Sequence, residues 1–346
     1  MEAPTFLTCL LSFAFCLLPF ALPGSAAFQS PGRLTTLDSS NALPPDIMGR
    51  FREPVGCERV PDGPTYVFDR RGHSVHTVDS DDRTFRTLVE IGGEPGRLLE
   101  PSAFDVAPDG SFAVADAPGG RERIQVFGPA GLRVGGFTRA GRSAARVAIG
   151  SLVLSGVGSL VYTGPSIVLS EPDTGWLFAE YGTLGEPLRS MGRLRATGHE
   201  DDRELHVALN AGLALPDGTG GFWFVFLAGP PAFRKYASSG ELMFERVMQG
   251  RELDPIVSAL PQRWPQRTAD AREAPLVPPL VRTAAVDRRG ALWVSFVQPF
   301  TYVFDADGEK VRTVQFRAAG LVAPSSLSFP EEDRVLITPG CYEFAF

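Results

Sequence analysis

The sequence has few of the side chains that bind transition metals or carry out redox chemistry. Among 346 residues there are 4 Cys and 4 His, so a zinc or redox site has few candidate ligands. His73 and His76 stand three apart, a spacing that places them on opposite faces of a strand. We therefore expect no zinc site and no bound cofactor.

Basic residues are outnumbered by acidic ones. The chain has 33 Lys and Arg against 40 Asp and Glu, and its formal net charge is −7. Because an acidic protein is repelled by polyanions, nucleic acid is an unlikely partner. The sequence also lacks a Gly-x-Ser-x-Gly nucleophile elbow and a Gly-rich phosphate-binding motif. These absences exclude the commonest serine hydrolase and nucleotide-binding patterns.

The first 27 residues have the pattern of an export signal. Residues 6–22 are apolar and uncharged, and residues 23–27 are small or turn-forming. We interpret residues 1–27 as a cleaved signal peptide, and the mature chain as secreted or periplasmic. The first residues contain Glu2 and no base, so an uncleaved N-terminal anchor remains the alternative. No later stretch is long and apolar enough to form a transmembrane helix.

What the sequence has in quantity is turn-forming residues and an internal repeat. Gly (37) and Pro (30) are abundant in a chain that is 44% hydrophobic. Residues 53–69 (EPVGCERVPDGPTYVFD) align with residues 100–116 (EPSAFDVAPDGSFAVAD), so that Glu53 matches Glu100 47 positions later. A constant offset of this size is typical of propellers and other repeat folds.

The stretch from 101 to 137 resembles an NHL repeat. It has a strand, a Pro-Asp-Gly turn, a strand ending in Asp, an Arg-Ile-Gln-Val-Phe strand, a Gly turn and a fourth strand. Weaker copies give six units between residues 51 and 346. The resemblance implies an all-β, six-bladed β-propeller with four-stranded antiparallel blades.

Two further patterns support blades. The second strands are continuous apolar runs, such as FWFVF at 222–226, which indicates cover on both faces. The last unit shows three strands, so we expect residues 28–50, and specifically 33–38, to supply a closing strand that pairs with the C-terminal strand. In this arrangement Cys57 and Cys341 lie in adjacent blades at one rim. They form either a disulfide that locks the ring or two buried thiols.

Candidate binding residues fall in two groups. Two long loops, 183–205 and 248–279, enter first strands on one face, and long loops gathered on one face mark a working surface. Their candidate ligand-binding residues are Arg195, His199, Arg263 and Trp264. A second group stands near the starts of the innermost strands, at the tunnel mouth: Glu53, Glu100, Arg146, Asn210, Arg282 and Ser325. Either set can instead merely solvate its surface.

Function is less determined than fold, because propellers host binding, scaffolding and catalysis alike. We expect an extracytoplasmic, monomeric binding propeller that presents its long loops to a protein, peptide or glycan. The alternative is a metal-assisted hydrolase or lactonase of the gluconolactonase type acting in the tunnel. That alternative implies Ca²⁺ held by Glu, Asp and Asn oxygens. Asn41 and Asn210 are the two Asn residues of the chain, and Asn41 precedes the propeller.

Overall fold

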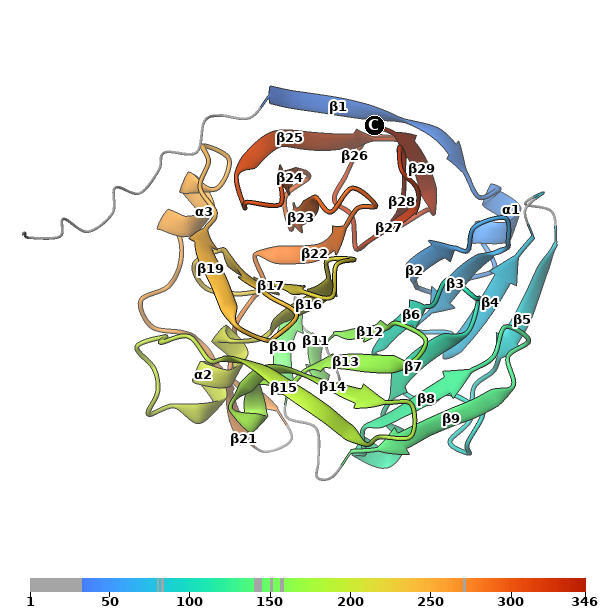
Figure 1. Cartoon of the computed structure of the whole chain (residues 1–346), viewed down its shortest axis with the longest axis horizontal. Coiled ribbons are helices and arrows are strands. Elements are labelled where there is room, and N and C mark those ends of the chain that lie inside the picture. The colour runs from blue at the N-terminus through green and yellow to red at the C-terminus, as the bar shows by residue number, and fades with distance from the viewer. Residues whose placement is uncertain are drawn as a thin grey trace, which may run out of the picture.

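Six four-stranded antiparallel blades form a ring in the computed structural model (Figure 1), and β1 (Arg33–Ala42) joins the last two blades into one continuous sheet. The structure describes residues 33–79, 81, 84–139, 145–149, 152–155, 159–269 and 272–346. The predicted signal peptide therefore lies outside the described residues. Blade 1 consists of β2 (Pro54–Arg59), β3 (Thr65–Asp69), β4 (Ser74–Val78) and β5 (Phe85–Val89). Blade 2 consists of β6 (Ala103–Val106), β7 (Phe112–Asp116), β8 (Arg123–Phe127) and β9 (Arg133–Thr138). Blade 3 consists of β12 (Leu160–Tyr162), β13 (Ser166–Ser170), β14 (Trp176–Gly182) and β15 (Pro187–Arg193).

Blades 4 to 6 continue the ring in the same strand order. Blade 4 consists of β16 (Gly212–Pro216), β17 (Phe222–Phe226), β18 (Ala232–Tyr236) and β19 (Leu242–Val247). Blade 5 consists of β22 (Val281–Val286), β23 (Leu292–Phe296), β24 (Thr301–Phe304) and β25 (Lys310–Arg317). Blade 6 consists of β27 (Ser326–Glu331), β28 (Arg334–Thr338), β29 (Tyr342–Ala345) and β1. The short β26 (Leu321–Val322) adds to β25. The predicted fold class is confirmed.

The hydrophobic core lies between the blades. All residues of β3, β7, β13, β17 and β23 are buried, as their apolar sequences predict. Six clusters of buried side chains each combine two neighbouring blades; in one of them Trp223 and Phe233 of blade 4 pack with Phe304 of blade 5. Each blade thus covers the faces of its neighbours, which is why the strands need no polar face.

Positive-φ glycines make the tight turns between strands. Gly110, in the Pro-Asp-Gly turn of blade 2, has φ +80°. Its carbonyl accepts a hydrogen bond of 2.9 Å from the hydroxyl of Tyr66 in blade 1. An added Cβ would lie 2.9 Å from that hydroxyl. Gly110 therefore serves both its turn and the contact between blades.

The N-terminal strand closes the ring in two steps. Residues 39–42 of β1 pair antiparallel with β29, which completes blade 6 as predicted. Residues 33–38, the segment expected to do this, pair parallel with β25 of blade 5 instead. The strand therefore spans two blades, and its register shifts between Ser39 and Asn41 where it passes from one to the other. Figure 1 shows β1 along the outer edge of both blades.

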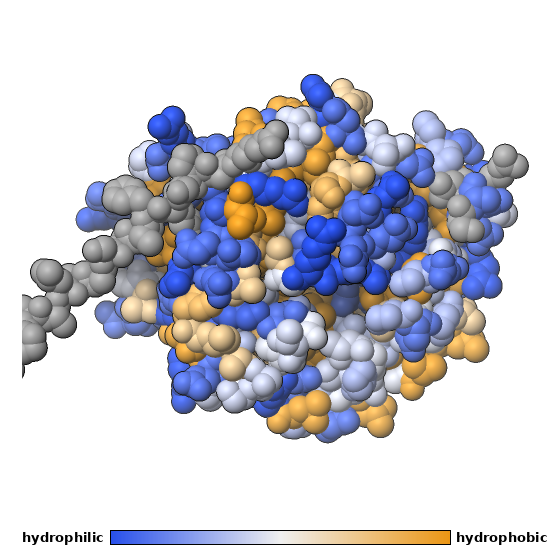
Figure 2. All heavy atoms as spheres, turned by 45° about the horizontal axis from the view of Figure 1, so that its top comes forward, coloured by the Kyte–Doolittle hydropathy of each residue, from blue (hydrophilic) through white to orange (hydrophobic). Residues whose placement is uncertain are grey.

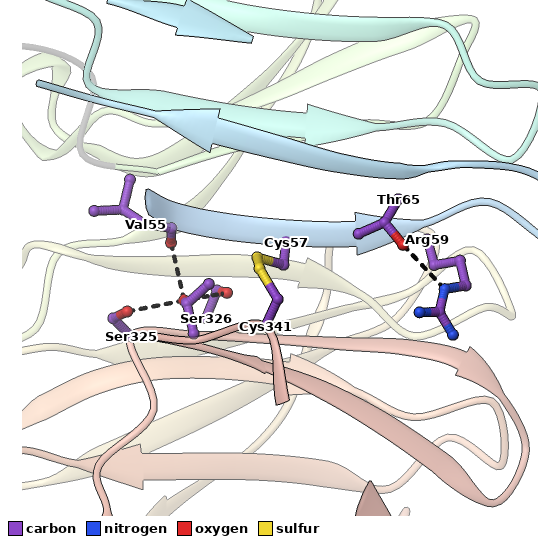
Figure 3. Close-up of a disulfide and its surroundings, with 8 residues drawn as sticks. Val55, Cys57, Arg59, Thr65, Ser325, Ser326 and Cys341 are labelled. Atoms are coloured by element: carbon purple, nitrogen blue, oxygen red, sulfur yellow. Dashed lines mark hydrogen bonds between the residues drawn. A yellow bond between two sulfur atoms is a disulfide. The ribbon is translucent and has the colours of Figure 1, made fainter. Parts of the chain in front are cut away.

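A disulfide joins the first and last blades (Figure 3). Cys57 of β2 is bonded to Cys341, directly before β29, and their Cα atoms are 5.7 Å apart. Beside it, the Thr338 hydroxyl donates to the Val55 carbonyl at 3.2 Å. The guanidinium of Arg59 binds the carboxylate of Glu343 at 2.7 Å. Of the two alternatives that the sequence left open, the structure thus has the disulfide, which belongs to a seam of cross-blade bonds.

Two segments expected to be long loops contain secondary structure. The segment 183–205 includes β15, the fourth strand of blade 3, and begins α2 (Arg203–Leu209). The prediction that this segment is one loop is therefore wrong. An exposed outer strand has few apolar residues, so its sequence does not indicate a strand. The segment 248–279 holds α3 (Asp254–Ser258) and the hairpin of β20 (Gln266–Ala269) and β21 (Arg272–Pro275). A further hairpin, β10 (Ala145–Ile149) with β11 (Leu152–Ser155), lies between blades 2 and 3.

The remaining helical segments are single turns. They are α1 (Pro45–Met48), which follows β1, and the 3₁₀ turns Pro118–Gly120 and Pro172–Thr174. In the described part of the chain, none of the helices has the length and hydropathy that a membrane span requires.

Candidate functional site

A cavity with a volume of about 1100 Å³ occupies the central tunnel. It is bordered by β2, β6, β12, β16, β22 and β27, which are therefore the innermost strands of their blades. Figure 2 shows a recess near the middle of one face, bordered mostly by hydrophilic residues. Within the tunnel the wall is mixed, and much of it is apolar: Val55, Phe68, Phe104, Leu160, Val161, Leu213, Leu215 and Leu327. A concave, largely apolar site with a few polar groups is typical of ligand binding.

Two carboxyl groups lie together in this wall. Glu58 of β2 and Asp105 of β6 come from adjacent blades, and their side chains share a hydrogen bond. Alternation along β2 places them there: Cys57 and Arg59 contact blade 6, so Glu58 faces blade 2. Each side chain is only partly exposed, to the interior of the tunnel.

Backbone amides of the next blade hold each carboxyl in place. The Val106 N–H donates to a carboxyl oxygen of Glu58 at 3.2 Å. The Tyr162 N–H of blade 3 donates to Asp105 at 2.6 Å. The innermost strand of a blade has a free edge, and these bonds satisfy amide groups on that edge. The two acids are therefore fixed by the fold rather than free to turn outward.

Burial dominates the electrostatics of the pair. It raises the pKa of Asp105 to about 7, although hydrogen bonds from Tyr162 and Val106 and from Glu58 oppose the shift. The pKa of Glu58 lies well above its ordinary value, because burial and the neighbouring Asp105 both disfavour its charge. Near neutral pH the two carboxyls therefore share a proton.

The other acidic groups in the tunnel wall have partners. Glu53 pairs with Arg70, with 2.5 Å between carboxylate and guanidinium. Asp217 binds the ammonium of Lys235 at 2.5 Å. Asp287 accepts the indole N–H of Trp293 at 2.9 Å. The last two are turn aspartates, and we assign them to structure.

The predicted tunnel-mouth residues divide into two groups. Glu53, Arg282 and Ser325 line the tunnel, as predicted. Glu100 is exposed, has φ +55° and is not among the lining residues. Its prediction fails because a turn precedes β6 and directs it away. Arg282 is the exposed guanidinium at the start of β22.

The last two tunnel-mouth predictions, Asn210 and Arg146, lie elsewhere in the fold. Asn210 is fully buried and caps α2: its amide accepts from the Arg195 N–H at 2.8 Å and donates to the His206 carbonyl at 3.0 Å. Arg146 is in β10, outside the blades, whereas the innermost strand of blade 3 begins at Leu160. The Arg146 side chain lies outside the described part.

Residues predicted on the long loops largely stabilise those segments. The Arg195 guanidinium donates to the carbonyls of Pro230, Leu209 and Ala228 and lies over the ring of Phe226. Burial lowers the pKa of Arg195 to about 10. Such a side chain has few donors left for a ligand.

Trp264 has a similar structural role. It packs on a small core formed by α2 with Ala228 and Val277, so it is not the free aromatic anchor that was expected. His199 is half-buried and Arg263 is exposed, and these two remain candidate contacts.

Glu58 and Asp105 are not among the site residues predicted from the sequence. The signal was nonetheless present, because both stand at the same position of the aligned repeats, five residues after Glu53 and Glu100. A metal is a weaker fit for the pair. Among the described residues no three His, Cys, Asp or Glu side chains converge, and Ca²⁺ takes six to eight oxygen ligands.

Comparison with known proteins supports the fold. No family model matches the chain, and no curated protein is similar to it in sequence. A virginiamycin B lyase from Staphylococcus aureus has a TM-score of 0.52 at 10% identity, covering 89% of this chain and 97% of that one. A streptogramin B lyase structure gives 0.50 at 10% identity, covering 84% and 92%.

A third similar structure has no known function. This protein of Bacteroides thetaiotaomicron gives a TM-score of 0.50 at 14% identity, covering 85% of this chain and 70% of that one. At these identities the similarity shows the fold alone. The chain is a six-bladed β-propeller similar in fold to these proteins.

Proposed function

We propose that this protein is an extracytoplasmic binding propeller of NHL-like repeats whose ligand is a small molecule held in the central tunnel. The observation that carries the proposal is the Glu58–Asp105 pair in the wall of the 1100 Å³ cavity. Burying two acids side by side is unfavourable, and perturbed carboxyl groups in a cavity are typical of functional sites. The disulfide supports export, because disulfides persist in oxidising compartments.

The long connectors are the segments 183–205 and 248–279, and in this proposal they border the tunnel and do not themselves form the binding site. They enter the blades at the end of the tunnel bordered by Pro279 and Val281. A protein, peptide or glycan that binds the connectors themselves would rely on Arg263 and His199, since Arg195 and Trp264 are engaged in the fold. The tunnel is better supported because its polar groups face open space.

Filling the tunnel tests the proposal. We would screen a library of small organic molecules of all charges by ligand-observed NMR against the wild type and Leu215→Trp. Leu215 lines the tunnel, so an indole there occupies ligand space. Leu242→Trp is the matched control, because Leu242 is 45% exposed on the outer strand of blade 4. We expect wild type and control to bind a common set of compounds that Leu215→Trp does not. Equal binding by all three proteins, or no binding by any, would refute the proposal.

A metal-assisted hydrolase or lactonase in the same tunnel is the second candidate. The observation that favours it is the pKa of Asp105, about 7, which suits a general base near neutral pH. Metal analysis of the purified protein separates the two candidates. A stoichiometric Ca²⁺ whose removal abolishes ester or lactone hydrolysis would support the enzyme, whereas ligand binding that is indifferent to chelators supports the binding protein.

A further inference from the structure

At the level of the acidic pair, the blades present different kinds of side chain to the tunnel. Glu58 and Asp105 each stand two residues before the residue whose N–H closes the following turn, Val60 in blade 1 and Ala107 in blade 2. Thr163, Asp217 and Asp287 close the corresponding turns of blades 3, 4 and 5. The residues two places before them, which also line the tunnel, are Val161, Leu215 and Ala285. At this level blades 1 and 2 are thus acidic, and blades 3, 4 and 5 present apolar side chains.

The pair also has no basic partner in the described part of the chain. The groups that determine its charge state are burial, the two carboxyls themselves and the amides of Val106 and Tyr162. Arg59, the next residue of β2, is directed to blade 6, where it binds Glu343. Arg70 is held by Glu53. Arg282 and Arg288 also line the tunnel, but neither is among the groups that set the pKa of Glu58 or Asp105. Within the pair, a negative charge is therefore balanced only by a proton.

We propose that the ligand of the tunnel carries an organic ammonium group that binds between Glu58 and Asp105, while its apolar part contacts the wall formed by Val161, Leu215 and Ala285. The proposal rests on the tunnel being the binding site and names the class of ligand. An ammonium group donates to carboxylate oxygens that the backbone amides leave unused.

Binding of an ammonium ion displaces the shared proton. In the free protein the proton lies between the two carboxyls; in the complex the R–NH₃⁺ group takes its place and the proton is released to solvent. No covalent bond forms or breaks. Because the proton and the cation compete, ligand affinity should rise as the pH rises through 7, where Asp105 ionises.

Three probes of one shape and different charge test the inference. The probes are 2-phenylethylammonium, its neutral analogue 2-phenylethanol, and the anion 3-phenylpropanoate, each titrated by calorimetry at pH 8 into the purified chain. We expect the ammonium probe to bind at least about tenfold more tightly than the alcohol, as a hydrogen bond to a charged group implies, with the anion weakest. Calorimetry in buffers of different ionisation enthalpy should show proton release with the ammonium probe alone near pH 7.

Two variants locate the preference. Asp105→Asn and Glu58→Gln keep an oxygen for the Tyr162 and Val106 amides and remove the charge. Each should reduce the ratio of ammonium to alcohol affinity to about one third or less of its wild-type value. Glu53→Gln is the matched control, because that carboxylate lines the same tunnel but is already paired with Arg70. It should retain the wild-type ratio.

The outcomes separate this inference from the tunnel proposal. If the alcohol or the anion binds the wild type as tightly as the ammonium probe, and Leu215→Trp abolishes that binding, the tunnel is a ligand site but its ligand is not a cation. If the ammonium preference survives in both acid variants, the cation lies elsewhere and the inference is wrong. Binding of none of the three probes in the tunnel would count against both proposals. Unchanged circular dichroism and a cooperative melt establish that each variant is folded.

Discussion

Removing the charge of Asp105 should make the folded protein more stable at alkaline pH. The pKa of this carboxyl is about 7, against an ordinary 3.8, because burial disfavours its charged form. The folded state therefore holds the proton more tightly than the unfolded chain does. Stability contributed by the proton is complete below about pH 4 and is lost as the pH rises through 7. The loss has an upper limit of about 4 kcal/mol at pH 8. Because the side chain is partly exposed to the tunnel and shares a proton with Glu58, we expect about 2 kcal/mol.

The assay is chemical denaturation of wild type and Asp105→Asn at pH 5 and pH 8. Asn retains an oxygen for the Tyr162 amide and offers Glu58 a donor, so the fold loses no hydrogen bond. The gain in unfolding free energy should be less than half as large at pH 5 as at pH 8. Glu53→Gln, the control, should show no gain at either pH, since it loses the ion pair with Arg70. An Asp105→Asn protein that is equally destabilised at both pH values would refute the account of the pair.

Three further predictions concern the ring, the connectors and the pH dependence of binding. Replacing Cys57 and Cys341 by Ala should lower the unfolding free energy by about 3 kcal/mol, because the disulfide links residues 284 positions apart and so restricts the unfolded chain. Chemical denaturation of the wild type and the variant, with and without reductant, measures this difference. Arg195→Ala should cost about 2 kcal/mol by leaving three backbone carbonyls without their donor, yet leave binding of 2-phenylethylammonium unchanged; an altered affinity would contradict the structural role. That affinity should fall severalfold from pH 8 to pH 6 in the wild type and by a smaller factor in Asp105→Asn, which retains only Glu58 as a titrating group of the pair.

The fold was predictable because the repeat combines local signals that agree. The Pro-Asp-Gly turn, the apolar second strand and the 47-residue offset each indicate the same unit. The errors occur where those signals weaken. β15 contains Pro187, Arg189 and Gly192 and is largely exposed, so its sequence does not distinguish an outer strand from a loop. The crossing of β1 from blade 5 to blade 6 depends on long-range pairing, which local pattern does not encode.

The site was less predictable for a different reason. Residues near the starts of the innermost strands were chosen by position, and position gave Glu53 and Arg282 correctly. Asn210 failed because a helix, not visible in the sequence pattern, takes its side chain as a cap. The sequence shows that Glu58 and Asp105 lie in strands, but not toward which neighbouring blade each side chain points. Only the packing of blade 1 on blade 2 brings them together.

Glu58 and Asp105 do more than the fold requires. Their structural contribution is one oxygen each, accepted by the amides of Val106 and Tyr162. Asn or Gln would supply that oxygen without the cost of burying a charge. Leu215 and Ala285 occupy the corresponding positions of blades 4 and 5, so the fold does not require a carboxyl at this position. Retaining two acids side by side therefore lowers stability near neutral pH for no packing benefit. Stability is commonly lost in this way at functional sites, and a cationic ligand that replaces the shared proton is the binding event in which both carboxylates become favourable.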